Sequence, residues 1–184
     1  MLSDVYRFRA GIYLSNNDVA EASRCYNLAL NAVDNGSARV DKNLLKALIL
    51  SEKAYMILNA YPDDKDSVDW AVSTSEKVLE YDEFDKSDRL YTLGLGYIKQ
   101  GKIDKGLPLL QKAAESYKEQ GDVERIRVAN TALLEIYANC GMYSSMAALV
   151  PQYIVDTDSV LDDEKAKALI LSLIHISEPT RRSY

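Results

Sequence analysis

Side chains able to do acid–base or metal chemistry are scarce in this sequence. It contains one histidine, His175, and two cysteines, Cys25 and Cys140, among 184 residues. Two cysteines are too few for a disulfide framework or for a zinc site built from four thiolates. His175 lies within residues 171–184, which we expect to be a non-native tail, so no histidine is left to lower a thiol pKa. We therefore interpret both cysteines as small buried residues of helices rather than as nucleophiles.

Acidic pairs and glycine motifs provide no stronger candidate. The pairs Asp63-Asp64 and Asp162-Asp163 lack the spaced oxygen ligands of a calcium loop, so we expect solvated acids in a loop and at a helix start. Gly94-Leu95-Gly96 lies in a helical pattern, and no phosphate-binding loop of the G-x-x-x-x-G-K-[ST] type occurs. We therefore expect no enzyme activity, no cofactor and no metal, and we assign no catalytic residue.

Composition and charge favour a helical binding protein. Hydrophobic residues make up 47% of the chain and charged residues 27%, which is typical of a globular protein and not of a disordered one. The net charge of −6 is unsuited to nucleic acid or to an anionic membrane. The first residues are charged where a signal peptide is apolar, and no uncharged apolar stretch of about 18 residues occurs. We expect a soluble chain without membrane contact.

The elements that would position a binding site follow from an internal repeat. From Gly94, a tyrosine follows at +3, a glycine at +7, a small residue at +12 and an alanine at +19. The same offsets recur from Ala10 and, in part, from Leu134, and a degenerate copy surrounds Tyr55 with Ala71, Ser75 and Val78 after a longer loop. Four copies thus lie about 40 residues apart, a period typical of stacked helical repeats.

Each offset predicts a structural feature. Offsets 0 to +7 mark the end of a first helix, and offsets +12, +16 and +19 form one stripe of a second helix. Small residues at 0 and +12 would let the two antiparallel helices approach closely; they are Ala10, Ala22, Gly94 and Gly106. A tyrosine at +3 or +16 would fill space in the packed repeats, and we interpret five tyrosines as packing residues: Tyr13, Tyr26, Tyr55, Tyr97 and Tyr137.

Helix ends are predicted from residues with special backbone preferences. At +7, Asn17, Gly101 and Gly141 would supply the left-handed conformation that ends a helix. Aspartates would cap the following helices at Asp18, Asp104 and Asp122. We expect Pro108 in the first turn after Asp104, where it removes no helical hydrogen bond, and we expect Pro151 to cut the last repeat's second helix short.

The pattern L-G-x-x-Y-x-x-x-G-x-x-x-x-G/A-x-x-x-L/Y-x-x-A, best seen in Leu93 to Ala113, resembles the tetratricopeptide repeat (TPR). The resemblance implies an all-α fold: a right-handed superhelix, or α-solenoid, of about four antiparallel helix pairs plus a C-terminal helix. We assign residues 1–155 to the TPR-like domain. The resemblance to the TPR also implies a protein or peptide partner on the concave face. Asn17, Lys99 and Asn130 are polar residues of first helices, but they match a carboxylate clamp poorly, so the binding residues are unknown.

The end of the sequence is interpreted separately. Residues 156–170 predict the start of a following helix and resemble the segment after the last repeat in bacterial TPR-containing sensor histidine kinases and related regulators; an ordinary capping helix is the alternative. Residues 171–181, which include His175, resemble a translated sequencing adapter. We therefore expect residues 171–184 to be a non-native tail and the natural chain to be cut off near Ile170.

These observations favour a protein–protein interaction scaffold, namely the sensory TPR region of a truncated bacterial signalling protein. One alternative is a stand-alone TPR adaptor or assembly factor, and another is a fragment of a nutrient-uptake surface lipoprotein. The sensor-kinase resemblance implies a periplasmic location, and the adaptor a cytoplasmic one. The sequence does not predict the oligomeric state or the identity of the partner.

Overall fold

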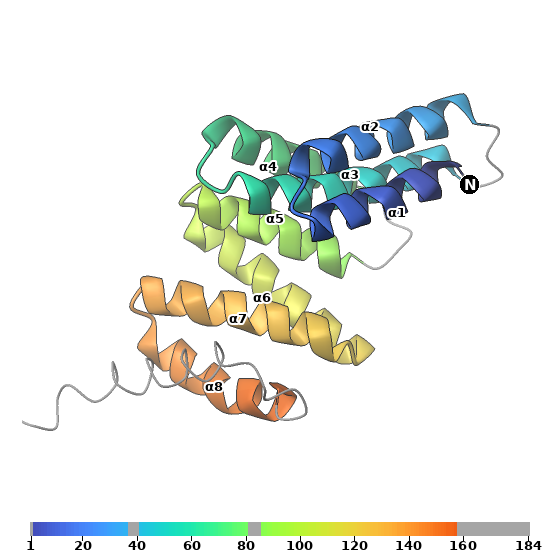
Figure 1. Ribbon diagram of the computed structural model, residues 1–184. Coiled ribbons are helices and arrows are strands. Elements are labelled where there is room, and N and C mark those ends of the chain that lie inside the picture. The colour runs from blue at the N-terminus through green and yellow to red at the C-terminus, as the bar shows by residue number, and fades with distance from the viewer. Residues whose placement is uncertain (1, 37–40, 81–85, 158–184) are drawn as a thin grey trace, which may run out of the picture. The chain divides into compact units, whose positions relative to one another are not determined.

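The computed structural model describes residues 2–36, 41–80 and 86–157. Within these ranges the chain forms eight α-helices and no strand (Figure 1). The helices follow one another as four pairs: α1 (Leu2–Ser15) and α2 (Val19–Asn35), α3 (Lys42–Ala60) and α4 (Lys65–Leu79), α5 (Ser87–Lys99) and α6 (Ile103–Gln120), α7 (Val123–Asn139) and α8 (Tyr143–Thr157). The predicted all-α arrangement of four helix pairs is confirmed. Residues 158–170 of the predicted C-terminal helix and the adapter-like residues 171–181 lie outside the described residues.

The chain divides into two compact units, Met1–Leu109 and Leu110–Tyr184, with the boundary inside α6. In the first unit α1 packs on α2, α2 on α3, and both α3 and α4 on α5. In the second unit α7 packs on α8. None of the helices in the described ranges is both long and apolar enough to cross a membrane.

Three of the four hairpins end their first helix in the same way. Asn17, Gly101 and Gly141 have φ values of 59°, 75° and 66°, so the predicted left-handed conformation is confirmed at each. The next residue donates its N–H to the carbonyl of a tyrosine five residues earlier: Asp18 to Tyr13 at 2.8 Å, Lys102 to Tyr97 at 2.9 Å and Met142 to Tyr137 at 2.8 Å. This Schellman arrangement satisfies carbonyls that the helix end would otherwise leave unpaired.

The predicted helix starts are confirmed at two positions and wrong at a third. Asp18 accepts a hydrogen bond from the Glu21 N–H at 3.1 Å, and Asp122 accepts one from the Arg125 N–H at 3.1 Å. Asp104 is not a cap, because α6 already begins at Ile103 and Asp104 lies in its first turn.

Both helical prolines also depart from the prediction. Pro108 lies inside α6, beyond its first turn, because that helix begins earlier than predicted. Pro151 lies inside α8, which continues to Thr157 and is therefore not cut short. Met146 and Tyr153 are 3% and 1% exposed on either side of Pro151. Their burial stabilises the helix although the proline removes one backbone donor.

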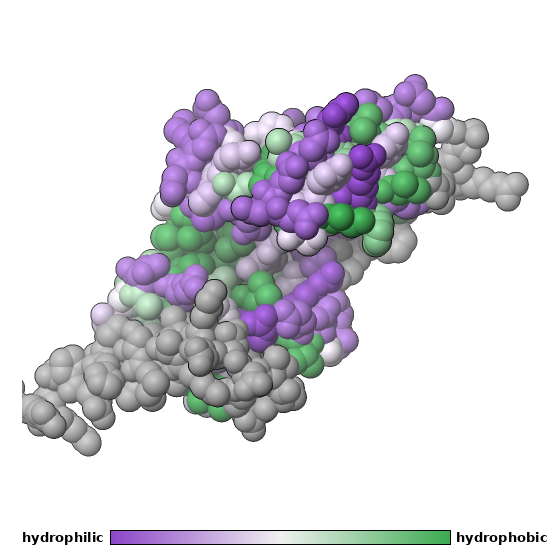
Figure 2. Space-filling model, in the orientation of Figure 1, coloured by the Kyte–Doolittle hydropathy of each residue, from purple (hydrophilic) through white to green (hydrophobic). Residues whose placement is uncertain are grey.

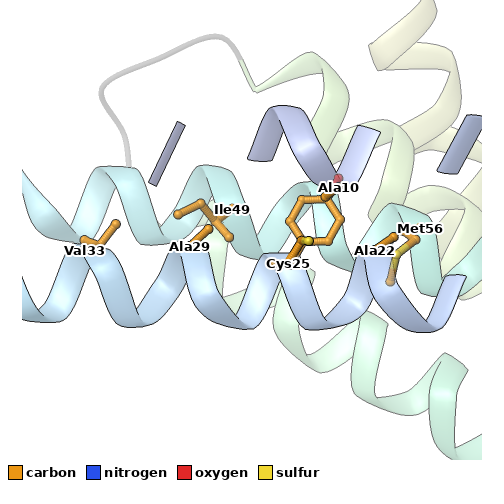
Figure 3. Packing of buried hydrophobic residues seen from close by; sticks show 8 residues of the cluster. Ala10, Ala22, Cys25, Ala29, Val33, Ile49 and Met56 are labelled. Carbon is orange, nitrogen blue, oxygen red and sulfur yellow. The ribbon is translucent and has the colours of Figure 1, made fainter. Parts of the chain in front are cut away.

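The first core forms where α1, α2 and α3 meet (Figure 3). The small residues Ala10 and Ala22 are fully buried there, as the repeat offsets predict. In the third hairpin the approach is closer still: a Cβ added to Gly106 would lie 2.6 Å from the Gly94 carbonyl oxygen. Glycine is therefore required where α6 meets α5.

The second hairpin differs from the others in its register. Its small buried residue on α3 is Ala54, and Val68 on α4 belongs to the same core cluster. Val68 follows Ala54 by 14 residues, whereas Ala22 follows Ala10 by 12. Compared with the first hairpin, the second has one extra residue at the end of its first helix, α3, and one in the connection to α4. The predicted placement of Tyr55 at offset +3 was therefore wrong, and Ile57 occupies that position.

Candidate functional site

The cysteines and acids considered for chemistry have separate local surroundings among the described residues. Cys25 is 3% exposed in the first core, as predicted. Cys140 lies exposed at the C-cap of α7, so its predicted burial was wrong. Asp64 caps α4 by accepting the Ser67 N–H at 2.9 Å. Within the described part of the chain no three His, Cys, Asp or Glu side chains gather as a metal ion would require; His175, Asp162 and Asp163 lie outside it.

One exposed stripe runs along the first helix of the second hairpin. On α3, residues spaced by three or four positions share one side of the helix. Leu48 and Tyr55 are 43% and 40% exposed on this side, and Glu52 and Asn59 lie between and beyond them. Arg7 of α1 and Tyr91 of α5 contact the stripe from its two flanks. We call these six residues the first-helix face: Arg7, Leu48, Glu52, Asn59, Tyr55 and Tyr91.

An ion pair fixes one flank of the first-helix face. The Arg7 guanidinium donates through Nε to Glu52 Oε2 at 3.0 Å and through a second nitrogen to Glu52 Oε1. The two side chains are 24% and 33% exposed. The hydrogen bond to Glu52 raises the pKa of Arg7 above its ordinary value. The two hydrogen bonds make the pair bidentate.

An aromatic contact fixes the other flank. The rings of Tyr55 and Tyr91 have centroids 6.1 Å apart and are tilted by 53°. Tyr91 is 8% exposed, so it holds the more exposed Tyr55 ring against α5. A tyrosine held in this way presents a large amphipathic surface at a low cost in side-chain entropy.

A different set of contacts joins α3 to the two second helices α2 and α4. The Lys53 ammonium lies 5.1 Å from the centre of the Trp70 ring and donates to Asn27 Oδ1 at 2.8 Å. Burial lowers the pKa of Lys53. Trp70 is 37% exposed, close to the value for Tyr55. These contacts join α2, α3 and α4 to one another. Trp70 is therefore a comparison residue for Tyr55, because the two aromatic rings are similarly exposed on different helices.

A cavity of about 590 Å³ lies at the turn between α3 and α4 and the end of α5. Gln100 donates to Asp69 Oδ1 at 2.6 Å, and the Lys65 ammonium lies 3.2 Å from Asp69 Oδ2. Hydrogen bonds from Lys65 and then Gln100 lower the pKa of Asp69. Lys102 donates to Gln100 at 2.8 Å, and Lys99 adds a third lysine to the lining. This polar pocket can accept hydrogen-bonding and anionic groups.

The three residues weighed for a carboxylate clamp have different local surroundings. Lys99 lines the polar pocket, Asn17 lies in the turn between α1 and α2, and Asn130 is 5% exposed within α7. Among the predicted packing tyrosines, Tyr26 and Tyr137 are each 5% exposed, which confirms their assignment. Tyr55 was wrongly assigned to packing. Its helical spacing from Leu48 is the signal that could have placed it on a surface.

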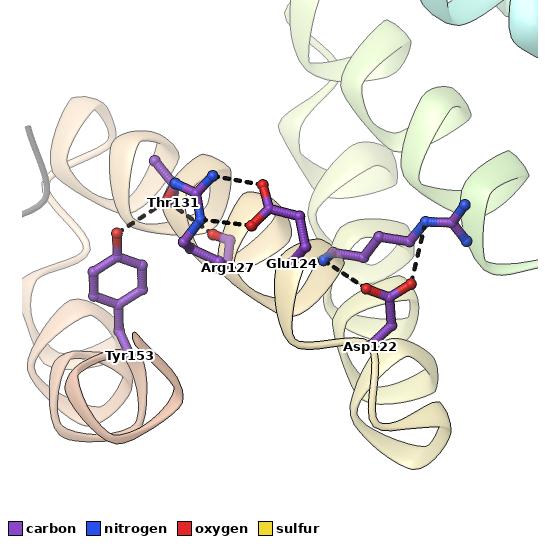
Figure 4. Close-up of polar contacts among 6 residues, drawn as sticks. Asp122, Glu124, Arg127, Thr131 and Tyr153 are labelled. Atoms are coloured by element: carbon purple, nitrogen blue, oxygen red, sulfur yellow. Dashed lines mark hydrogen bonds and ion pairs between the residues drawn. The ribbon is translucent and has the colours of Figure 1, made fainter. Parts of the chain in front are cut away.

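The second unit stabilises its own hairpin with polar contacts (Figure 4). Arg127 donates to both oxygens of Glu124, at 3.2 and 2.6 Å, within the first turns of α7. Thr131 of α7 and Tyr153 of α8 are joined by a hydrogen bond of 3.3 Å between their hydroxyls. Because Tyr153 is almost fully buried, this bond helps to hold α8 against α7.

Comparison with known proteins identifies the fold. No family model matches the chain, and no curated protein matches its sequence. The crystal structure of aspartyl phosphate phosphatase F from Bacillus subtilis matches with a TM-score of 0.70 at 13% identity, over 96% of this chain and 49% of that one. The fold is a TPR-like helical repeat. This chain spans about half the length of that phosphatase.

Two further structures align with lower scores. BtubC (BKLC) from P. vanneervenii has a TM-score of 0.48 at 17% identity, over 95% of this chain and 79% of that one. A kinesin light chain protein with nearly identical TPR-like repeats, from Podosopora anserina, has a TM-score of 0.45 at 15% identity, over 98% of this chain and 97% of that one.

Proposed function

We propose that this TPR-like chain is a protein-interaction scaffold that binds a peptide or protein segment on the first-helix face. The observation that carries the proposal is the pair of large apolar side chains, Leu48 and Tyr55, exposed on one stripe of α3 beside the fixed Arg7–Glu52 pair. Apolar side chains exposed together and bordered by charge are typical of protein interaction sites.

The geometry supports binding rather than catalysis. Tyr55 would be the anchor, because its ring is already held by Tyr91 and loses little freedom when a partner covers it. Covering the exposed parts of Tyr55 and Leu48 would contribute about 1–2 kcal/mol each from apolar burial. The ionised Arg7–Glu52 pair would lie at the border of the contact and favour partners with complementary polar groups there.

The finer proposal is that this scaffold is the sensory region of a bacterial signalling protein. Its support is the sequence of residues 156–170, which resembles the segment that links such repeats to an output domain. Sequencing the natural gene past codon 170 tests it. We expect a continuous reading frame that encodes a membrane span or an output domain. A stop codon within a few residues would contradict the sensor proposal and leave the scaffold proposal intact.

The binding proposal is tested by selecting peptides from a random display library against the full chain. Affinities of the selected peptides are then compared for wild type, Tyr55→Ala and Tyr61→Ala. Tyr61 is a matched control because it is 46% exposed but lies in the turn after α3. Loss of a buried aromatic anchor should weaken binding about tenfold or more in Tyr55→Ala. Equal affinity in all three chains would contradict the proposed face.

A further inference from the structure

The polar pocket at the α3–α4 turn and the end of α5 holds more positive than negative charge. Lys65, Lys99 and Lys102 line it together with two acids, Asp63 and Asp69. All of its lining residues belong to the first compact unit. The surface over α4 is mainly purple, and therefore hydrophilic, at the upper left of Figure 2. This local balance of charge is opposite to the net charge of −6 on the whole chain.

One lysine and one acid of the polar pocket neutralise each other. The Lys65 ammonium lies 3.2 Å from Asp69 Oδ2, and Gln100 donates to Asp69 Oδ1 at 2.6 Å. Both carboxylate oxygens of Asp69 therefore have a partner within the chain. Because the charge of Lys65 largely cancels the field of Asp69, this pair neither attracts nor repels a charged ligand strongly.

The other two lysines keep their charge available to a ligand. The Lys102 ammonium donates to Gln100 Oε1 at 2.8 Å and lies 5.8 Å from the centre of the Tyr97 ring. Both neighbours are neutral, so they orient this ammonium without neutralising it. Within the described residues the Lys99 ammonium has no ion-pair partner. The Gln100 amide uses one hydrogen on Asp69 and has a second one to donate.

We propose that the polar pocket binds a phosphate group through the Lys99 and Lys102 ammonium groups, with Gln100 as a further donor. A phosphate group carries about −1.5 to −2 charges at neutral pH, whereas a carboxylate carries about one. Two available ammonium groups therefore match a phosphate better than a carboxylate, and lysine is a common phosphate-binding residue. The volume of about 590 Å³ also admits part of the molecule that carries the phosphate.

The acid Asp63 makes the proposal sharper. It lines the polar pocket and, within the described residues, has no ion-pair partner. Its charge opposes the binding of any anion, so removing that charge should strengthen phosphate binding. Removing the charge of Lys99 should have the reverse effect. Opposite changes from two lining residues are expected of a ligand held inside the pocket.

Titration of the isotope-labelled full chain with sodium phosphate, followed by NMR at neutral pH and constant ionic strength, tests the proposal. Wild type should show saturable shifts in the amide signals of residues 99–102. Two unit charges about 4 Å apart in water interact by an energy equivalent to about fivefold in affinity. Lys99→Gln should therefore weaken binding about fivefold, and Asp63→Asn should strengthen it by up to about fivefold. The matched controls are Lys112→Gln and Glu115→Gln, at exposed positions of α6 outside the pocket.

Each outcome of the phosphate titration decides the proposal. Saturable binding that weakens in Lys99→Gln, strengthens in Asp63→Asn and stays unchanged in the two controls supports it. A wild-type chain without saturable shifts overturns it, and so does unchanged affinity in Lys99→Gln. Equal changes in the control variants also overturn it, because affinity would then follow the net charge of the chain. Circular dichroism should show unchanged helicity in all four variants, because each changed side chain is exposed.

Two further ligands define the chemistry that the pocket recognises. Acetate at the same ionic strength should bind more weakly than phosphate, and equal binding of acetate would overturn the assignment to phosphate. A short peptide with one phosphoserine separates the two sources of the group. Tighter binding of this peptide than of inorganic phosphate supports a phosphate carried by a partner, and weaker or equal binding supports a free phosphate ion.

Discussion

The helices α1 and α5 have the same place in their hairpins but very different surroundings. In α1 only Ser3 and Ala10 are buried, whereas in α5 eight of thirteen residues are buried, including Arg89 and Thr92. Both helices contact the second helix of their own hairpin, but α5 is also covered by α3 and α4. The offset within the repeat therefore sets which residues must be small, and the neighbouring hairpin sets how much of the remaining helix is buried.

Exchanging residues between equivalent positions should expose this difference most clearly. Placing the α1 residue in α5, as Gly96→Ile, forces a branched side chain against Val72 and should destabilise the chain by about 3 kcal/mol. Truncating Ile12 to Ala at the equivalent exposed position should change stability by less than about 0.5 kcal/mol. Urea unfolding at low protein concentration measures both. Similar losses in the two variants would mean that α1 is covered as α5 is.

Alanine substitutions at two glycines should have opposite signs. Gly106→Ala places a methyl group 2.6 Å from the Gly94 carbonyl and should cost about 2 kcal/mol, because the backbones must separate. Nothing lies within 4 Å of a Cβ at Gly11, so Gly11→Ala should stabilise α1 by about 0.5–1 kcal/mol through helix propensity. Thermal unfolding of the two variants checks the sign. If Gly106→Ala stabilised the chain instead, that result would contradict the close contact between α5 and α6.

The aspartates at the starts of α2 and α6 should differ by a smaller amount in their contribution to stability. Asp18 caps α2 through the Glu21 N–H, so Asp18→Ala should cost about 1 kcal/mol. Asp104 only favours the α6 dipole from within the first turn, so Asp104→Ala should cost about 0.3 kcal/mol. Denaturant midpoints measure both, and a larger loss in Asp104→Ala would show that it is the capping residue after all.

Two tyrosines should ionise late for different physical reasons. Burial raises the pKa of Tyr26 to about 12, and the hydrogen bond to Glu76 raises the pKa of Tyr97 to about 12. Each folded-state pKa is above the ordinary value of 10, so the folded chain favours the neutral form of each tyrosine. The contribution of each neutral tyrosine to folding stability is therefore present below pH 10 and is lost as the pH rises toward 12. Tyrosinate absorbance after a rapid pH jump should show that Glu76→Gln shifts one late titration downward. The Tyr26 titration should stay in place, and a shift of both would contradict the separate causes.

The repeat offsets predicted the parts of the fold that depend on local chemistry. The number of helix pairs follows from the period, and the left-handed turns at Asn17, Gly101 and Gly141 follow from residue types that tolerate that backbone. Caps at Asp18 and Asp122 follow in the same way. Each of these features is decided by a residue and its immediate neighbours, so one sequence suffices to predict it.

Features that depend on packing between helices were not predicted. The two extra residues of the second hairpin shift its register, and only the burial of Ala54 shows where the small position lies. Without that register the repeat offsets predict Tyr55 as a packing residue, whereas it is exposed. The sequence predicts that Pro151 ends its helix early, but the burial of Met146 and Tyr153 outweighs the backbone donor lost at Pro151. The first-helix face combines α1, α3 and α5, which no local pattern brings together.

The most direct test of partner binding compares the two sides of the second hairpin. Tyr55 and Trp70 are 40% and 37% exposed, on the first and the second helix of that hairpin. Hydroxyl-radical footprinting with mass spectrometry, with and without a selected peptide, measures the solvent access of both rings in one experiment. The account predicts that the peptide protects Tyr55 and leaves Trp70 as reactive as before. Protection of Trp70 with an unchanged Tyr55 would contradict the first-helix face as the binding surface.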